Sequence, residues 1–255
     1  MSEQVGEVRI LGLDGIPQVR PGDDLARLIG DALDRAGLDL VASDILVVTH
    51  KIVSKAEGRL VDLREVEPSP LARRFAAAWE KDPRQVEMVL RESERLVRME
   101  RGIIIAETAH GFICANAGVD ASNVAPEIVC LLPVDPDASA ARLRAALEAR
   151  FGVAPAIVIS DSFGRPWRVG IVNVAIGVAG LAPLADYRGQ FDAAGYEMHV
   201  TVLAVADELA SAAELVMHKL TARPVVMIRG YQPPTAMPAG TGRDLILDPA
   251  RNLFR

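Results

Sequence analysis

Apolar positions along the chain follow either the spacing of a helix or the continuous runs of buried strands. Residues 21–37 (PGDDLARLIGDALDRAG) place apolar side chains at alternating steps of three and one, after an acidic start and before Gly37. This spacing predicts an amphipathic helix with one buried face. The following run DILVVT is short and continuously apolar, which predicts a buried strand.

Polar segments follow the predicted strands. Residues 50–59 (HKIVSKAEGR) are too basic and too close to a glycine to belong to the core, so we expect a polar stretch suited to anions. Helical patterns cover residues 71–81 and, after the cap Asp82-Pro83, residues 84–99. Two strand-like runs, GIIIA and IVCLLP, then bracket the polar, glycine-bearing segment 107–127.

The second half of the chain continues the alternation. The pattern predicts a helix over residues 138–150 and a strand over AIVISD. It predicts a further strand over YEMHVTVLAV that leads into a helix from about Asp207, and a strand over VVMIRG before an irregular tail. The apolar run 169–185 contains Asn173, Pro183 and three glycines, so it predicts buried strand and loop and not a membrane span. These elements predict a mixed α+β protein with one large domain or two intimate subdomains.

Composition narrows the class of protein. The chain has 255 residues, half of them apolar, which is enough for a full core. Its net charge of -6 argues against a nucleic-acid partner, because phosphate backbones need a clustered basic surface. Cys114 and Cys130 lack metal-site spacing, and the N-terminus lacks a secretory pattern. We expect a cytoplasmic protein with reduced thiols and no membrane association.

Three polar clusters combine carboxylates, hydroxyls and cations after strand-like runs. They are His50, Lys51 and Lys55; Asp120 and Asn123; and Asp161, Ser162, Arg165 and Arg168. Hard cations such as Mg²⁺ take oxygen ligands and usually share them with nucleotide phosphates. Lysine and arginine suit the anionic end of such a substrate. Together the clusters indicate a phosphoryl-transfer site.

Each cluster also has a purely structural explanation. Asp161 and Ser162 could form a turn or a helix cap, and GVDASN (118–123) could be a loop that satisfies its own backbone. His50 could be a core histidine, and Arg165 and Arg168 a solvated face. The common motifs of nucleotide loops, nucleophile elbows and zinc sites do not occur. The residues alone therefore support a metal- and phosphate-dependent enzyme as a hypothesis, and nothing finer.

Four segments together resemble the coenzyme F420-0:gamma-glutamyl ligase family. They are THKIVSKAEGR, ETAHGFICANAGVDASNV, ISDSFGRPWRVGIVNVAIGVAG and VADELASAAELVM, in this order over almost the whole chain. The resemblance implies a non-Rossmann mixed α and β fold over residues 1–255, with two subdomains and an intertwined, butterfly-shaped homodimer. Some relatives carry a C-terminal reductase-like domain, which we do not expect here.

The resemblance also implies an activity: GTP-dependent addition of L-glutamate to coenzyme F420-0, and then of further gamma-linked glutamates. The precursor carboxylate would attack the GTP gamma-phosphate to give an acyl phosphate, which the glutamate amine then attacks, so that GDP and phosphate are released. The implied cofactors are Mg²⁺ or Mn²⁺, two ions by expectation, with K⁺ as a further candidate.

Site residues carry over from the family by position. The implied metal ligands and catalytic residues are Asp120, Asp161 and Ser162. The implied GTP contacts are Leu13, Asp14, Gly15, Ile16, His50, Lys51, Lys55, Asn123 and Lys219. Many archaeal members have a Gly-Gln pair after the ELVM helix, where the glutamine contributes to the second metal. Here His218 and Lys219 follow that helix, so the number of metals is open.

Two other classes of function remain compatible with the sequence. A metal-dependent phosphatase or nucleotidase would use the same carboxylates to activate water. A non-catalytic protein would bind a nucleotide or a deazaflavin, with MHKL marking a lost metal site. Phosphate release from GTP without glutamate distinguishes the first, and GTP binding without turnover distinguishes the second.

Overall fold

A five-stranded mixed sheet forms the centre of the computed structural model, which describes residues 6–233 and 237–252. The strands lie in the order β1 (Arg9–Gly12), β12 (Val225–Arg229), β2 (Ile45–Thr49), β8 (Ala156–Arg165) and β9 (Arg168–Ala179). β2 and β8 run parallel, and all other neighbours run antiparallel. The inner strands read as continuous apolar runs because both faces of the sheet are covered.

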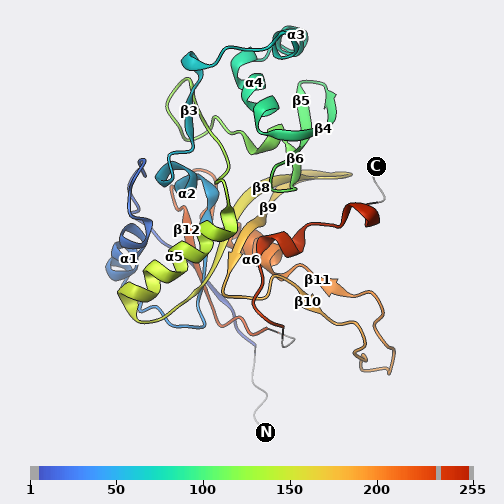
Figure 1. The fold of residues 1–255 in the computed structure, drawn as a ribbon. Coiled ribbons are helices and arrows are strands. Elements are labelled where there is room, and N and C mark those ends of the chain that lie inside the picture. The colour runs from blue at the N-terminus through green and yellow to red at the C-terminus, as the bar shows by residue number, and fades with distance from the viewer. Residues whose placement is uncertain (1–5, 234–236, 253–255) are drawn as a thin grey trace.

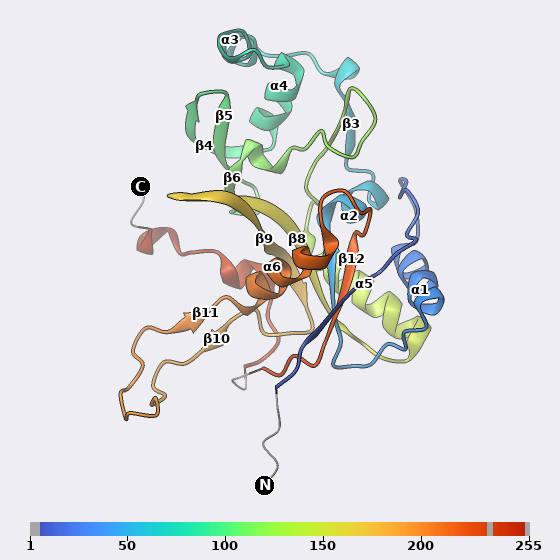
Figure 2. The same cartoon turned by 180° about the vertical axis from the view of Figure 1, so that it is seen from behind.

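Helices cover the two faces of this sheet. α1 (Leu25–Ala36) and α5 (Pro136–Phe151) lie on the face turned to the viewer in Figure 1, and α6 (Val205–Met217) lies on the face seen in Figure 2. Ile157 and Ile159 of β8 pack in the α1 and α5 layer, whereas Val158 packs in the α6 layer. This alternation is the two-residue period of a strand between two cores.

The segment between β2 and α5 forms a smaller lobe above the sheet (Figure 1). Its own apolar core joins two helices to a three-stranded and a two-stranded antiparallel sheet, β4-β5-β6 and β3-β7. The elements are α2 (His50–Ala56), β3 (Leu60–Asp62), η1 (Leu63–Glu65), α3 (Pro70–Trp79), α4 (Pro83–Arg91), β4 (Ser93–Glu100), β5 (Ile103–Thr108), β6 (Ile113–Ala115), η2 (Asn116–Gly118) and β7 (Ile128–Cys130).

An arm built on β10 (Ala185–Asp186) and β11 (Val202–Leu203) projects from the sheet, at the lower right of Figure 1. Two short 3-10 helices, η3 (Gly242–Leu245) and η4 (Pro249–Arg251), follow β12. Within the described ranges, no helix has the length and apolar character needed to cross a membrane.

A bulge in β9 sets the register of the long β8–β9 hairpin. Ile159 lies opposite Gly177, but Ser160 lies opposite Ala175, so Ile176 is the extra residue on β9. A bulge of this kind turns two successive side chains to the same face. Ile176 is buried in the α5 layer, and the Cα of Gly177 faces the first residue of α5.

Carboxylates from the first turns of two helices hold the backbone on either side of this bulge. Asp207 of α6 accepts a hydrogen bond from the Ala175 N–H at 2.8 Å. Asp137 of α5 accepts one from the Val178 N–H at 2.8 Å and another from the Gly242 N–H at 2.6 Å. Burial raises the pKa of Asp207, and the Ala175 N–H opposes that rise. Both layers therefore fix the register of β9.

Most predicted elements are confirmed, and four segments differ. The strand predicted over YEMHVTVLAV (196–205) is reduced to Val202–Leu203. The mixed α+β class holds, as do the first helix and the strands DILVVT and VVMIRG. The helix predicted over 84–99 ends at Arg91, and β4 follows because its backbone pairs with β5. Residues 50–59, predicted as polar and outside the core, begin with the buried helix α2. The strand predicted to end at Asp161 continues to Arg165, because it pairs with β9.

Gly177 provides a test of the bulge. A Cβ atom at this position would lie 2.5 Å from the Pro136 carbonyl oxygen, so Gly177→Ala should lower the free energy of unfolding by about 1–3 kcal/mol in urea titrations. Gly164 is the matched control, because a Cβ atom there meets nothing within 4 Å and Gly164→Ala should change stability by less than about 0.5 kcal/mol. Equal effects of the two substitutions would contradict this packing.

Candidate functional site

A cavity of about 690 Å³ opens where β2 ends beside the continuing strand β8. The two strands are parallel, and Thr49 at the end of β2 pairs with Ser160. The carboxyl ends of parallel strands are a common place for ligands in α/β sheets, and this volume lies in the usual range of ligand pockets. The 49–55 segment, the 120–123 loop, the β8–β9 hairpin and the residues after α6 line the cavity.

Helix α2 carries the first cluster of basic side chains, His50, Lys51 and Lys55. Thr49 caps the helix by accepting a hydrogen bond from the Lys51 N–H at 3.2 Å, and His50 is 2% exposed. Lys55, one turn later, is 7% exposed and donates to the Asn123 carbonyl oxygen at 2.6 Å. Burial lowers the pKa of Lys55, and the nearby charge of Lys51 lowers it further. Helix α2, which follows β2 directly, thus places two ammonium groups and an imidazole at the cavity.

The loop after η2 carries a carboxylate that faces these lysines. Asp120 Oδ1 accepts the Ser122 N–H at 2.6 Å, which is the backbone-satisfying contact that the structural alternative for GVDASN describes. Asp120 Oδ2 lies 2.7 Å from Lys51 Nζ, which also donates to the Ser122 hydroxyl. Burial acts to raise the pKa of Asp120, but the hydrogen bonds from Lys51 and Ser122 outweigh it, and the pKa is lowered.

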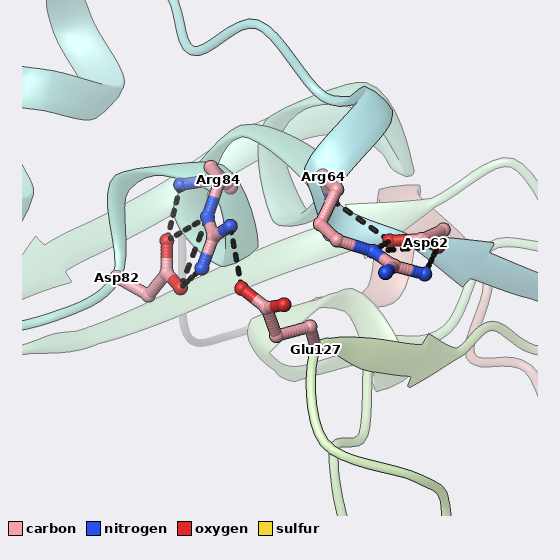
Figure 3. Close-up of polar contacts among 5 residues, drawn as sticks. All are labelled: Asp62, Arg64, Asp82, Arg84 and Glu127. Carbon is pink, nitrogen blue, oxygen red and sulfur yellow. Dashed lines mark hydrogen bonds and ion pairs between the residues drawn. The ribbon is translucent and has the colours of Figure 1, made fainter.

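Ion pairs hold the far end of this loop against helix α4 within the smaller lobe (Figure 3). Arg84, in the first turn of α4, pairs with Asp82 at 2.7 Å and with Glu127 at 3.0 Å. Arg64 pairs with Asp62 at the end of β3, whose partner strand β7 begins just after Glu127. The loop that carries Asp120 and Asn123 is therefore anchored to α4 as well as to β7.

The β8–β9 hairpin carries the second carboxylate and a hydroxyl. Asp161 Oδ1 lies 3.2 Å from His50 Nε2 and accepts the Ser162 N–H at 2.7 Å. Ser162 Oγ accepts a hydrogen bond from Lys219 Nζ at 2.5 Å and lies 2.7 Å from Asn173 Oδ1. Lys219 follows α6, so the hairpin joins both helix layers at the cavity.

Ser160 lies between these groups with its hydroxyl unused. It is 1% exposed and lines the cavity, and across the described part of the chain its Oγ has no hydrogen-bond partner. Buried hydroxyls are normally paired. This hydroxyl therefore leaves hydrogen-bonding capacity unused beside the cavity.

Each of the three side chains expected to hold a metal has a cationic or imidazole neighbour. Asp120 faces Lys51, Asp161 faces His50, and Ser162 faces Lys219. Among residues 6–233 and 237–252, no group of three His, Cys, Asp or Glu side chains forms a ready metal centre. These three side chains offer two carboxylates and one hydroxyl, which suit a hard cation shared with a substrate.

The N-terminal stretch expected to contact the nucleotide is only partly at the cavity. Ile16 lines it, whereas the Leu13 side chain is fully buried in the core. Asp14 pairs with Arg223, a cavity residue, at 2.6 Å, and Gly15 adopts a positive φ of 76°. Asp14 and Gly15 do not line the cavity themselves.

The two arginines of ISDSFGRPWR lie outside the cavity. Arg165 donates to the Val169 carbonyl oxygen at 2.6 Å near the hairpin tip, and Arg168 is exposed. Sequence reasoning also missed Asn173, Glu214 and Arg223, which line the cavity. Asn173 was detectable in principle, because it is a lone amide within an otherwise apolar strand.

Comparisons with known proteins agree on one family. A family model described as F420-0:Gamma-glutamyl ligase matches residues 15–230. The coenzyme F420:L-glutamate ligase of Methanopyrus kandleri is 45% identical over 257 residues, which cover 98% of this chain and 100% of that protein. The proteins of the same name from Methanothermobacter thermautotrophicus and Methanocaldococcus jannaschii are 47% and 39% identical, over 88% and 100% of this chain and 89% and 100% of their own lengths.

Lys51 controls the titration of Asp120. Lys51→Met removes the ammonium and should raise the pKa of Asp120, measured by carboxyl ¹³C NMR. Burial raises this pKa, and the variant loses the Lys51 hydrogen bond and charge that lower it. In the wild type the lowered pKa stabilises the fold above the unfolded value of about 3.9, and this is lost as the pH falls through the folded pKa. The variant should therefore lose stability at pH 7. Lys81→Met, outside the cavity, is the control and should leave Asp120 unchanged.

Proposed function

Because the chain belongs to the F420-0:gamma-glutamyl ligase family, we propose that it joins L-glutamate to coenzyme F420-0 in coenzyme F420 biosynthesis, with GTP as the energy source. The names of the relatives support the ligase reaction with glutamate. The use of GTP and of divalent metal is our further proposal. It rests on one observation, the cavity that gathers Asp120, Asp161 and Ser162 with three lysines.

The charges that line the cavity fit a nucleotide triphosphate with divalent cations. Four cations, Lys51, Lys55, Lys219 and Arg223, face three carboxylates, Asp120, Asp161 and Glu214, which leaves a net charge of about +1. A triphosphate carries roughly four negative charges, so the side chains alone leave most of them uncompensated. Mg²⁺ or Mn²⁺ would compensate the remainder, and the carboxylates and hydroxyl are suitable ligands.

We assign roles to the residues accordingly. Asp120, Asp161 and Ser162 would hold the metal, which supplies charge neutralisation at the transferring phosphoryl group. The ammonium groups of Lys51, Lys55 and Lys219 would move from their present partners to phosphate oxygens, because charge-assisted bonds to phosphate are strong. His50 and Asn123 would complete the nucleotide site beside the backbone of residues 13–16. On the phosphates, the Lys219 ammonium would supply part of the positive charge of a second metal. K⁺ would be a further bound cation.

The proposed reaction has two steps. A carboxylate oxygen of F420-0 attacks the gamma-phosphorus of GTP, the bond to the bridging oxygen breaks, and GDP leaves with that electron pair. The amine of glutamate then attacks the acyl carbon, phosphate leaves, and the amine loses a proton as the amide forms. Further glutamates would add through the gamma-carboxylate in the same way. Positioning of three substrates in line would supply much of the rate.

We also propose that the protein is a homodimer, as the resemblance implies. Three exposed apolar side chains on the β10–β11 arm, Phe191, Tyr196 and Val200, are 66%, 64% and 86% exposed. Val169 and Ile171 near the hairpin tip are 97% and 57% exposed. Exposed apolar groups of this kind gather at protein interfaces.

The ligase reaction is tested by mass spectrometry of products. Purified protein with F420-0, GTP, Mg²⁺ and L-glutamate should give products that differ by a fixed glutamate mass, with GDP release that requires both other substrates. Asp161→Ala should reduce this turnover at least about 10²-fold without unfolding, because the metal loses a carboxylate. Asp39→Ala, at an exposed position outside the cavity, is the control with full activity expected.

Three results would change the proposal. Phosphate release from GTP without glutamate would replace the ligase with a phosphatase or nucleotidase. GTP binding without turnover under any metal would indicate a non-catalytic binding protein. An active Asp161→Ala enzyme would remove this residue from the metal site.

The dimer is tested by light scattering. The wild type should have twice the mass of the chain, and Phe191→Asp with Val200→Asp should give the monomer, because two charges enter an apolar contact. A monomeric wild type would refute the dimer and leave the ligase assignment intact.

A further inference from the structure

A chain of three hydrogen bonds runs from the cavity into the α6 layer. Lys219 Nζ is 2.5 Å from Ser162 Oγ, which is 2.7 Å from Asn173 Oδ1, and Asn173 Nδ2 is 2.9 Å from Glu214 Oε2. Ser162 lies on β8, Asn173 opposite it on β9, and Glu214 on α6. Asn173 is 5% exposed, so only a small part of the residue meets solvent at the cavity wall.

The chemistry of its two ends gives this chain one direction. A carboxylate only accepts, so Glu214 holds the NH₂ group of the Asn173 amide, and the amide oxygen must face Ser162. That oxygen also only accepts, and the Ser162 hydroxyl proton therefore points to Asn173. An ammonium only donates, which places Lys219 against the lone pairs of Ser162.

From this we propose that Asn173 and Glu214 are positioning residues that turn the lone pairs of Ser162 toward the cation in the cavity. The inference rests on the proposed function, because the cation is the divalent metal assigned there to Ser162. Without Glu214 the amide is free to flip, and without the amide oxygen the hydroxyl proton is free to turn toward the cation. In the structure, the positive charge next to the Ser162 hydroxyl oxygen is the Lys219 ammonium.

A double-mutant cycle with Mn²⁺ as the probe tests this role. Binding of MnCl₂ to the purified full-length protein is measured by electron paramagnetic resonance of free Mn²⁺, without nucleotide. Asn173→Leu and Glu214→Met should each weaken Mn²⁺ binding about tenfold, the lower end of the loss that such outer ligands usually cause. The double variant should bind no more weakly than Asn173→Leu, because Glu214 acts through the amide.

Two further variants separate positioning from charge and from structure. Glu214→Gln keeps an acceptor for the Asn173 NH₂ group and should restore Mn²⁺ affinity to within about threefold of the wild type. Ser211 donates to the Asn173 main-chain carbonyl oxygen at 2.7 Å and does not touch the amide. Ser211→Ala should therefore lower thermal stability while Mn²⁺ affinity stays unchanged.

Several outcomes would overturn the inference. These are additive losses in the double variant, equal losses for Glu214→Gln and Glu214→Met, unchanged Mn²⁺ affinity in Asn173→Leu, or no saturable Mn²⁺ binding by the wild type. Product formation by the wild type, measured separately by mass spectrometry, shows whether the proposed ligase reaction stands when the positioning role fails.

Discussion

The bulge at Ile176 is the constraint on which the cavity depends. Residues directly opposite each other in an antiparallel pair point to the same face, and a shift of one residue reverses that face. With the bulge, Ser162 lies opposite Asn173 and the two side chains meet at 2.7 Å. Without it, Asn173 would face the layer opposite to Ser162. The carboxylates of Asp137 and Asp207, which hold the neighbouring backbone, therefore act on the site from a distance.

Positive and negative side chains in the cavity nearly offset each other, and this arrangement defines what a ligand must offer. Asp120 has its pKa lowered by Lys51, and Lys55 has its pKa lowered by burial. Both pKa shifts arise because these charged side chains lie close together and are partly buried. The lysines stabilise a bound anion, and the carboxylates stabilise a bound cation. Binding of an anion and a cation together is therefore more favourable than binding of either ion alone. A metal–phosphate pair meets this requirement.

The sequence predicted the parts of this site that depend on local pattern. Apolar runs located β2 and β8, and the residues that follow them, Lys51 and Asp161, do lie at the cavity. Arg165 and Arg168 were grouped with Asp161 by proximity in sequence, but β8 continues past Asp161 to Arg165, and Arg168 begins β9 on the other side of the hairpin tip. Glu214 could not be found from local pattern, because its position at the cavity depends on how α6 packs on β9.

The continuation of β8 beyond β2 explains how one strand serves both walls of the cavity. Where β2 gives way to α2, the parallel neighbour of β8 ends, and side chains of β8 on both faces become available to ligands. Asp161 then reaches His50 in the smaller lobe, whereas Ser162, one residue on, reaches Lys219 beyond α6. The two-residue period that distributes Ile157 and Val158 between two cores thus distributes carboxylate and hydroxyl between two sides of one site. Fold and site follow the same alternation, and only the character of the side chains changes along the strand.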